Sequence, residues 1–238
     1  LVRDRWPNAV ARLGQDTKEF GDMTFHELVP SSFEELCRWA YVHLRTRGQD
    51  TGRGLIFLYQ PLDPSIPPSM SVNGTEVIVR FQGFLGQCNL KALGNWKGRV
   101  FNSLLAVQYV ELKAGPFVDQ MAAQIGCVEN IRKCVFRALL TTDDAAAAER
   151  SSEVSEVGIS FQRRVFTKVQ SGPDAPHSVL TMMDDPNGQA SLVSRFWRVT
   201  EKIELGRKLL TGRVERCSPL VFGYGDFVDV AARIEIAN

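Results

Sequence analysis

The sequence predicts an α+β fold built mainly on antiparallel β-sheet, as a sandwich or a partly open barrel, with two or three helices packed on it. Segments with the alternating pattern of strands recur along the chain and are joined mainly by short turns. Only one helical region, residues 117–140, is long enough to supply the crossover that a parallel strand pair needs. We therefore expect a single α+β domain over residues 1–238.

The clearest strand lies near the end of the chain, at residues 227–236. Apolar side chains alternate there with polar or small ones, which is typical of a strand with one buried and one wet face. The apolar positions are Val228, Val230, Ala232, Ile234 and Ile236. An earlier run alternates in the same way through Val77, Val79 and Phe81, and its glycines, Gly83 and Gly86, indicate a bulge or bend near its end.

Further strands follow from apolar runs and turn signals. Residues 55–59 and 100–112 are apolar on both faces, which favours buried strands, and the second should be central in its sheet. From residue 158 onwards, Val165, Thr167 and Val169 should share one strand face. A short strand is expected at residues 178–183, before a turn at residues 185–188.

Two helices have recognisable starts. Ser32 and Glu35 form a capping box, and the helix that follows should run to about Arg47. Pro116 suits the first position of the second helix, residues 117–140, which we expect Gly126 to kink or break. The acidic, small-residue segment that follows, residues 141–157, is predicted to be an exposed loop.

The charge composition limits how the chain could attract a charged partner. Lys and Arg total 28 against 27 Asp and Glu, so the net charge of +1 creates no global attraction to nucleic acid or to an anionic membrane. Any such affinity must come from a local patch. The sequence has no uninterrupted apolar run of about 18 residues, which argues against a membrane span.

The five cysteines are odd in number and widely spaced, which favours free thiols in a reducing, intracellular compartment. They are Cys37, Cys88, Cys127, Cys134 and Cys217. The chain begins with Leu1 rather than Met, and its last predicted strand runs almost to Asn238. Both ends look like cuts, which predicts a processed product or an excised part of a longer chain.

We expect no catalytic, cofactor or metal site from sequence motifs. The three histidines, His26, His43 and His177, accompany no nucleophile motif, and no phosphate-binding glycine pattern or zinc-type cysteine pairing occurs. The acidic pairs are accounted for by turns and caps. These pairs are Asp143 with Asp144, Asp184 with Asp185, and Asp226 with Asp229. An enzyme whose site is assembled from scattered residues remains an alternative.

Basic residues interleaved with aromatic ones are the best candidates for a binding surface. Arg164, Phe166 and Lys168 are expected to share one face of a strand. On the strand near residue 196, one face should carry either Arg195 with Trp197 or Phe196 with Arg198. Single-stranded nucleic acid is held in this way, with bases stacked on aromatics at about 1–3 kcal/mol each and cations along the phosphates. The full candidate set is Arg164, Phe166, Lys168, Arg195, Phe196, Trp197, Arg198, Arg207 and Lys208.

The same residues also allow a purely structural interpretation, because strand aromatics are usually core and neighbouring arginines a solvated face. Our leading hypothesis is a non-enzymatic binding module for single-stranded nucleic acid. The alternative is a structural or assembly subunit whose basic and aromatic faces meet another protein chain or a second copy.

Overall fold

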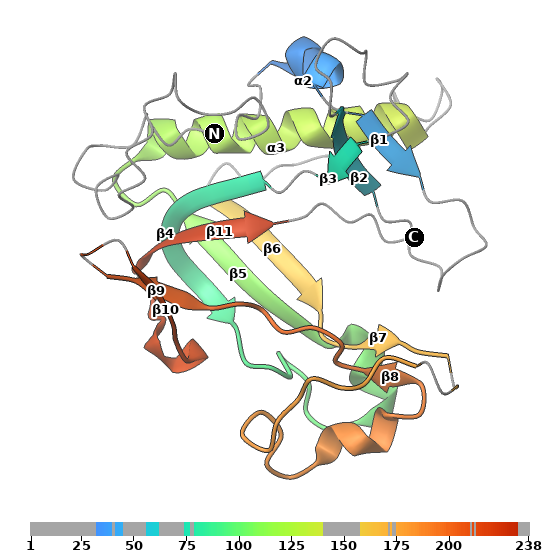
Figure 1. The fold of residues 1–238 in the computed structure, drawn as a ribbon. Coiled ribbons are helices and arrows are strands. Elements are labelled where there is room, and N and C mark those ends of the chain that lie inside the picture. The colour runs from blue at the N-terminus through green and yellow to red at the C-terminus, as the bar shows by residue number, and fades with distance from the viewer. Residues whose placement is uncertain are drawn as a thin grey trace. The chain divides into compact units, whose positions relative to one another are not determined.

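A computed structural model of the chain confirms a mainly antiparallel α+β fold (Figure 1). The structure describes residues 32–39, 41–44, 56–61, 74–76, 79–139, 158–170, 172, 175–209, 211 and 213–232. Their strands form sheets with the orders β1-β2-β3, β11-β4-β5-β6, β7-β8 and β10-β9. Every pairing with a described register is antiparallel. The predicted loop at residues 141–157 lies outside the described residues.

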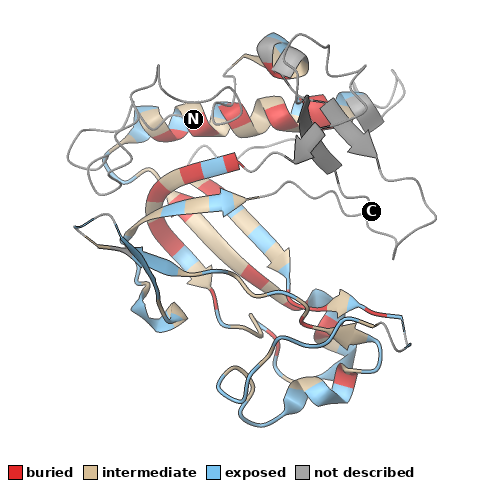
Figure 2. Cartoon of the chain, in the orientation of Figure 1, coloured by how far each residue is buried: buried red, intermediate tan, exposed pale blue. Residues whose placement is uncertain are grey.

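The chain divides into two compact units, and the first comprises residues 1–83, 114–158 and 227–238. Its described elements are α2 (Phe33–Trp39), β1 (Tyr41–Leu44), β2 (Ile56–Pro61), β3 (Gly74–Glu76), the beginning of β4 (Val79–Asn89), α3 (Val118–Leu139) and β11 (Phe227–Ala232). Buried and exposed positions alternate around α3, as in an amphipathic helix (Figure 2).

A buried amide joins α3 to β4 in the first unit. The Gln124 side chain, only 1% exposed, accepts a hydrogen bond from the Gln82 N–H and donates one to the Gln82 carbonyl, both at 2.7 Å. The Gln124 amide thus satisfies both backbone groups of Gln82, as a neighbouring strand would. On β11, Asp229 pairs with Arg80 and also accepts from Gln82 Nε2 at 2.9 Å, which links β11 to β4.

The second unit comprises residues 84–113 and 159–226. Its elements are the rest of β4, the 3-10 helix η6 (Val100–Leu105), β5 (Val107–Lys113), β6 (Gly158–Arg164), β7 (Thr167–Lys168), η7 (Gln189–Val193), β8 (Trp197–Arg198), β9 (Gly206–Lys208), β10 (Val214–Arg216) and η8 (Pro219–Val221). Its core cluster consists of Trp96, Ala106, Val165, Phe166, Val193 and Val199.

Several predicted elements are confirmed. Alternating burial at residues 228–232 matches the pattern of β11, and β5 lies between β4 and β6 in its sheet. The register of β4 against β5 shifts between Leu85 and Cys88, where Gly86 predicted a bulge. The predicted turn at residues 185–188 closes with a 3.0 Å hydrogen bond from the Gly188 N–H to the Asp185 carbonyl.

Other predictions were wrong because long-range pairing and packing override local pattern. The first helix ends at Trp39 instead of Arg47, since the following residues pair as β1 with β2. Residues 100–105 form η6 rather than the first half of a strand. Residues 178–183 form no strand; a 2.9 Å bond from the Val179 N–H to the Val199 carbonyl ties this segment to its neighbour.

The helix α3 runs unbroken through Gly126, contrary to the predicted kink or break. Gly126 is exposed, and a Cβ built on it meets no atom within 4 Å. Nothing in this part of the helix depends on the missing side chain. The helix also falls short of a membrane span: among the described residues no helix combines the length and apolarity required.

Gly126→Ala should therefore stabilise the protein by about 0.5–1 kcal/mol, because alanine loses less backbone entropy in a helix and encounters no clash. The change in the free energy of unfolding can be measured by urea denaturation. A lower free energy in the variant would contradict the open environment that the structure assigns to this position.

Candidate functional site

All nine predicted site residues lie in the second unit, but they do not form one surface. Phe166 is 2% exposed and packs edge-to-face on Trp96, with 4.9 Å between ring centroids. Its ring is part of the core and is not presented to a ligand. The expected face shared with Arg164 and Lys168 is absent, because β6 ends at Arg164 and both Val165 and Phe166 turn inward.

Arg198 has a structural role. Its guanidinium donates to the carbonyls of Ser194 at 2.9 Å and of Pro176 at 2.9 Å, with a longer bond to that of Ala175. It thereby fastens two loop segments to β8. Across the β7-β8 pair, Lys168 lies opposite Trp197, which is half-buried against the core cluster.

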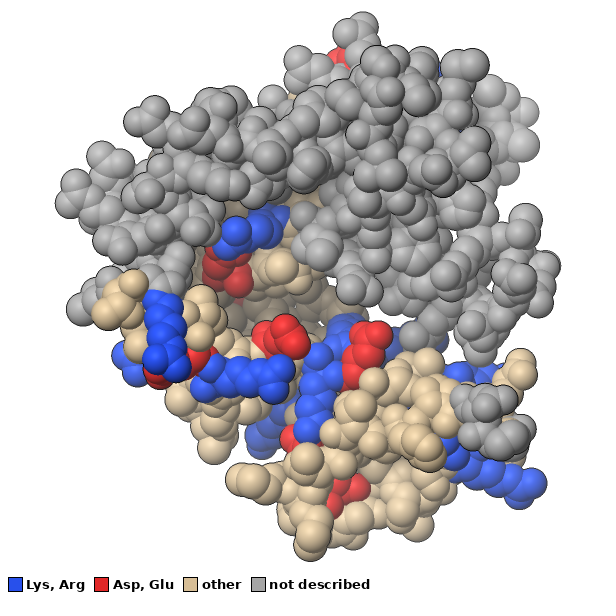
Figure 3. Space-filling view, viewed as in Figure 1, with Lys and Arg blue, Asp and Glu red and all other residues tan. Residues whose placement is uncertain are grey.

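The remaining predicted residues are dispersed. Arg195 is exposed, and its guanidinium lies 5.1 Å from the ring centre of Phe196, itself 51% exposed. Arg207 and Lys208 belong to β9, which pairs with β10 in a separate two-stranded sheet. Around them Lys and Arg side chains are interspersed with Asp and Glu on the face drawn in Figure 3. Nucleic-acid binding stays a prediction.

The acidic residues of this unit are largely engaged internally. Asp185 caps η7 by accepting from the N–H groups of Gln189 and Ala190, and Asp226 accepts from the Gly223 N–H. Burial alone would raise the pKa of Asp184, but hydrogen bonds from Lys202 and Thr181 outweigh it and hold the pKa below its ordinary value. The predicted turn and capping roles are confirmed for these three acids.

A tight loop ahead of η6 is held by side-chain and backbone hydrogen bonds. The Asn95 side chain accepts from the Val107 N–H at 2.8 Å, while the Asn95 N–H donates to the Val107 carbonyl at 3.0 Å. Trp96 is 8% exposed, and its indole N–H donates to the Arg99 carbonyl at 2.9 Å. These bonds fix both ends of the loop, so its side chains are held in place.

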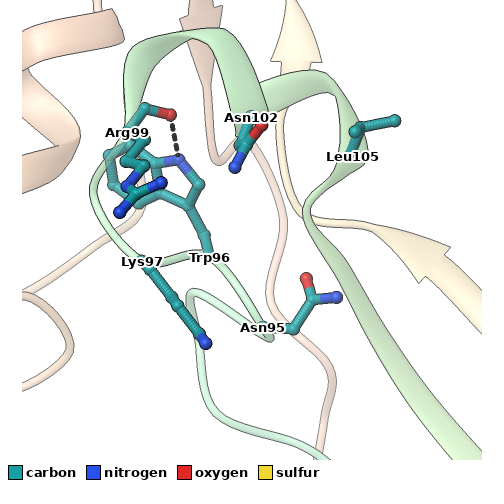
Figure 4. A pocket seen from close by; sticks show the side chains of 6 residues that line it. All are labelled: Asn95, Trp96, Lys97, Arg99, Asn102 and Leu105. Carbon is teal, nitrogen blue, oxygen red and sulfur yellow. Dashed lines mark hydrogen bonds between the residues drawn. The ribbon is translucent and has the colours of Figure 1, made fainter.

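A pocket of about 330 Å³ opens beside this loop (Figure 4). It is lined by Asn95, Trp96, Lys97, Arg99, Asn102 and Leu105. Lys97 and Arg99 are exposed, no acidic side chain lines the pocket, and neither cation forms an ion pair with a carboxylate of the described residues. The lining therefore combines an aromatic wall with hydrogen-bond donors and positive charge.

Next to the pocket, η6 turns its apolar side chains to solvent. We define the η6 surface as Val100, Phe101, Leu104 and Leu105, which are 56%, 73%, 48% and 71% exposed. Ser103, by contrast, is buried and donates to the Val100 carbonyl at 2.8 Å. The helix η7 contacts η6 and exposes Leu192, and the region over η7 and the loop before it is largely uncharged in Figure 3.

Sequence reasoning missed the η6 surface because it read residues 100–112 as one buried strand. One signal was present: Asn102 and Ser103 interrupt the apolar run near its beginning, which does not fit a strand buried on both faces.

Among the described residues of the site, no catalytic arrangement of side chains is recognisable. Within the described part of the chain, no group of three or more His, Cys, Asp or Glu side chains is placed to hold a metal ion. The five cysteines are free, and burial, reinforced at Cys134 by the neighbouring Cys37 thiol, raises the pKa of Cys127 to about 11 and that of Cys134 to about 12. Such thiols are poor nucleophiles at neutral pH.

Comparison of the chain with protein-family models, with curated proteins and with solved structures finds no match. The functional argument therefore depends on the contacts, burial and charges of this chain alone.

The loop geometry predicts a strict need for glycine at position 94. Gly94 has a φ of +54°, and a Cβ there would lie 2.2 Å from the Val107 carbonyl oxygen. Gly94→Ala should lower the free energy of unfolding by about 2 kcal/mol or more. Gly188→Ala is the matched control, because Gly188 has a φ of +62° but open space around it; about 1 kcal/mol is expected there. Equal losses in urea denaturation would contradict the close approach.

Asp184 should make the protein acid-sensitive. Its folded pKa is lowered, so its stabilising effect is present above the unfolded value of about 3.9 and is lost as the pH falls through the folded pKa. In Asp184→Asn, the free energy of unfolding should thus decline less between pH 5 and pH 2 than in the unaltered protein. Parallel pH profiles from urea denaturation would show that the ion pair with Lys202 does not contribute.

Proposed function

We propose that the chain is a non-enzymatic protein-binding module whose second unit docks an acidic protein segment with apolar anchors on the η6 surface. The observation that carries the proposal is the exposure of four large apolar side chains on one short helix, with Phe101 at 73% and Leu105 at 71%. Exposed contiguous apolar side chains beside polar groups are typical of interaction sites.

The helix η6 does not need these side chains for its own folding. Ser103 faces the interior, and the loop before the helix is held by hydrogen bonds of Asn95 and Trp96. Burying one such side chain at an interface contributes about 1.5–3 kcal/mol. A partner that covers the η6 surface would therefore gain affinity from groups that contribute little to the stability of the free chain.

The charges next to the η6 surface indicate an acidic partner. Lys97 and Arg99 have no ion-pair partner among the described carboxylates, and Arg195 is exposed beside Phe196. The nearby acids Asp184 and Asp185 are engaged with Lys202 and with η7. Complementary charge at an interface rim raises the association rate and selects the partner.

A protein partner fits these observations better than single-stranded nucleic acid does. Phe166 is buried and Arg198 is bonded to backbone carbonyls, so two of the residues expected to hold bases and phosphates are otherwise occupied. Aliphatic side chains such as Leu104 and Leu105 offer no stacking platform for bases. They do suit the apolar centre of a protein interface.

The test uses fluorescence-labelled synthetic peptides in which Leu, Phe or Trp alternates with Asp or Glu, and matched peptides with Asn and Gln in place of the acids. The acidic peptides should bind the full chain more tightly. Phe101→Ser combined with Leu105→Ser should weaken that binding at least about tenfold, because each removes a buried apolar anchor. Leu220→Ser is the matched control, since Leu220 is 84% exposed on η8, outside the η6 surface.

Three outcomes would overturn the proposal. One is the absence of binding to every acidic peptide, and another is unchanged binding in the Phe101→Ser, Leu105→Ser variant. The third is stronger binding to a labelled single-stranded oligonucleotide that weakens steeply with salt, which would support the nucleic-acid hypothesis instead. Circular dichroism of each variant distinguishes lost binding from lost folding.

A further inference from the structure

We propose that the pocket beside η6 receives the side-chain carboxylate of an Asp or Glu of the docked segment. This inference rests on the proposed function and adds to it a specific anchoring site. Asn102 and Leu105 line the pocket and also belong to η6, so the pocket is continuous with the η6 surface. A segment lying on that surface brings its polar side chains to the pocket's edge.

The polar lining favours an anion. Lys97 and Arg99 supply positive charge, and no lining residue supplies negative charge. Because the Asn95 side-chain oxygen already accepts from the Val107 N–H, its amide NH₂ is left to donate. The Trp96 indole N–H is not available, since it donates to the Arg99 carbonyl. Hydrogen bonds from charged donors to a carboxylate are stronger than those between neutral groups.

The apolar lining favours a carboxylate carried on methylene groups. Trp96 and Leu105, which line the pocket (Figure 4), provide hydrocarbon surface for the methylene groups of a Glu or Asp side chain. The volume, about 330 Å³, lies at the small end of ligand pockets and is large enough for a Glu or Asp side chain.

The frame of the pocket is already in place without a ligand. Asn95 is bonded twice to Val107, and Trp96 is fixed by Arg99 and by Phe166. Little ordering of this frame is then needed on binding, which preserves affinity. The lysine and arginine side chains are the parts that must be immobilised.

The experiment is a double-mutant cycle between the pocket and the best-binding acidic peptide. Each Glu or Asp of the peptide is replaced by Gln or Asn in turn, and each peptide is titrated against the unaltered chain, Lys97→Met and Arg99→Met. At one peptide position the loss of the carboxylate should weaken binding about fivefold or more in the unaltered chain and much less in the variants. Lys133→Met, an exposed charge on α3, is the control and should leave that effect unchanged.

The cycle separates failure of this inference from failure of the proposed function. If peptides bind and depend on Phe101, but every carboxylate has the same effect in all variants, the pocket inference is wrong and the proposed function stands. If inorganic phosphate displaces the peptide at lower concentration than N-acetylglutamate does, the pocket is a phosphate site and the inference is likewise overturned.

A second measurement is independent of any peptide. N-acetylglutamate should shift the indole N–H resonance of Trp96 in a nitrogen-15 correlation spectrum, whereas N-acetylglutamine should not. The shift should disappear in Arg99→Met. If both compounds shift the resonance equally, or if the shift persists in that variant, the pocket does not recognise a carboxylate.

Discussion

The arrangement of the second unit depends on one buried side chain, that of Trp96. Its ring packs edge-to-face on Phe166 in the core, and its N–H closes the loop by donating to the Arg99 carbonyl at 2.9 Å. A buried indole N–H without an acceptor would be costly, so the two contacts are mutually dependent. The chain must leave the core at Arg99, and η6 begins at the next residue.

The closing of the loop by Trp96 explains why apolar residues face solvent directly after a well-packed loop. The core of the second unit is completed by Trp96, Val165 and Phe166, while Ser103 is the buried residue of η6. Phe101 and Leu105 lie outside this core, and both are exposed. In the proposed function these side chains are buried against a partner, which is the arrangement that their apolar chemistry favours.

Features of the structure that local sequence pattern determines could be predicted. Features that depend on contacts between residues far apart in the sequence could not. The alternation of β11, the length of α3 and the turn that begins at Asp185 were all recognisable locally. Residues 164–169 were read as one continuous strand, but Val165 and Phe166 both enter the core, which breaks the period. Nor could spacing reveal that Arg198 bonds to carbonyls more than twenty residues away. The pocket joins residues 95–105, yet it exists only because Trp96 turns inward.

Although the net charge of the chain is near zero, its acidic and basic side chains are not engaged to the same extent. Asp184 is paired with Lys202, and Asp185 and Asp226 accept hydrogen bonds from backbone N–H groups. Lys97 and Arg99 have no ion-pair partner among the described carboxylates. At physiological salt an exposed charge acts over only about 8 Å. In the proposed function, the cations therefore act mainly at contact and contribute to the selection of an acidic partner, while the η6 surface supplies most of the affinity.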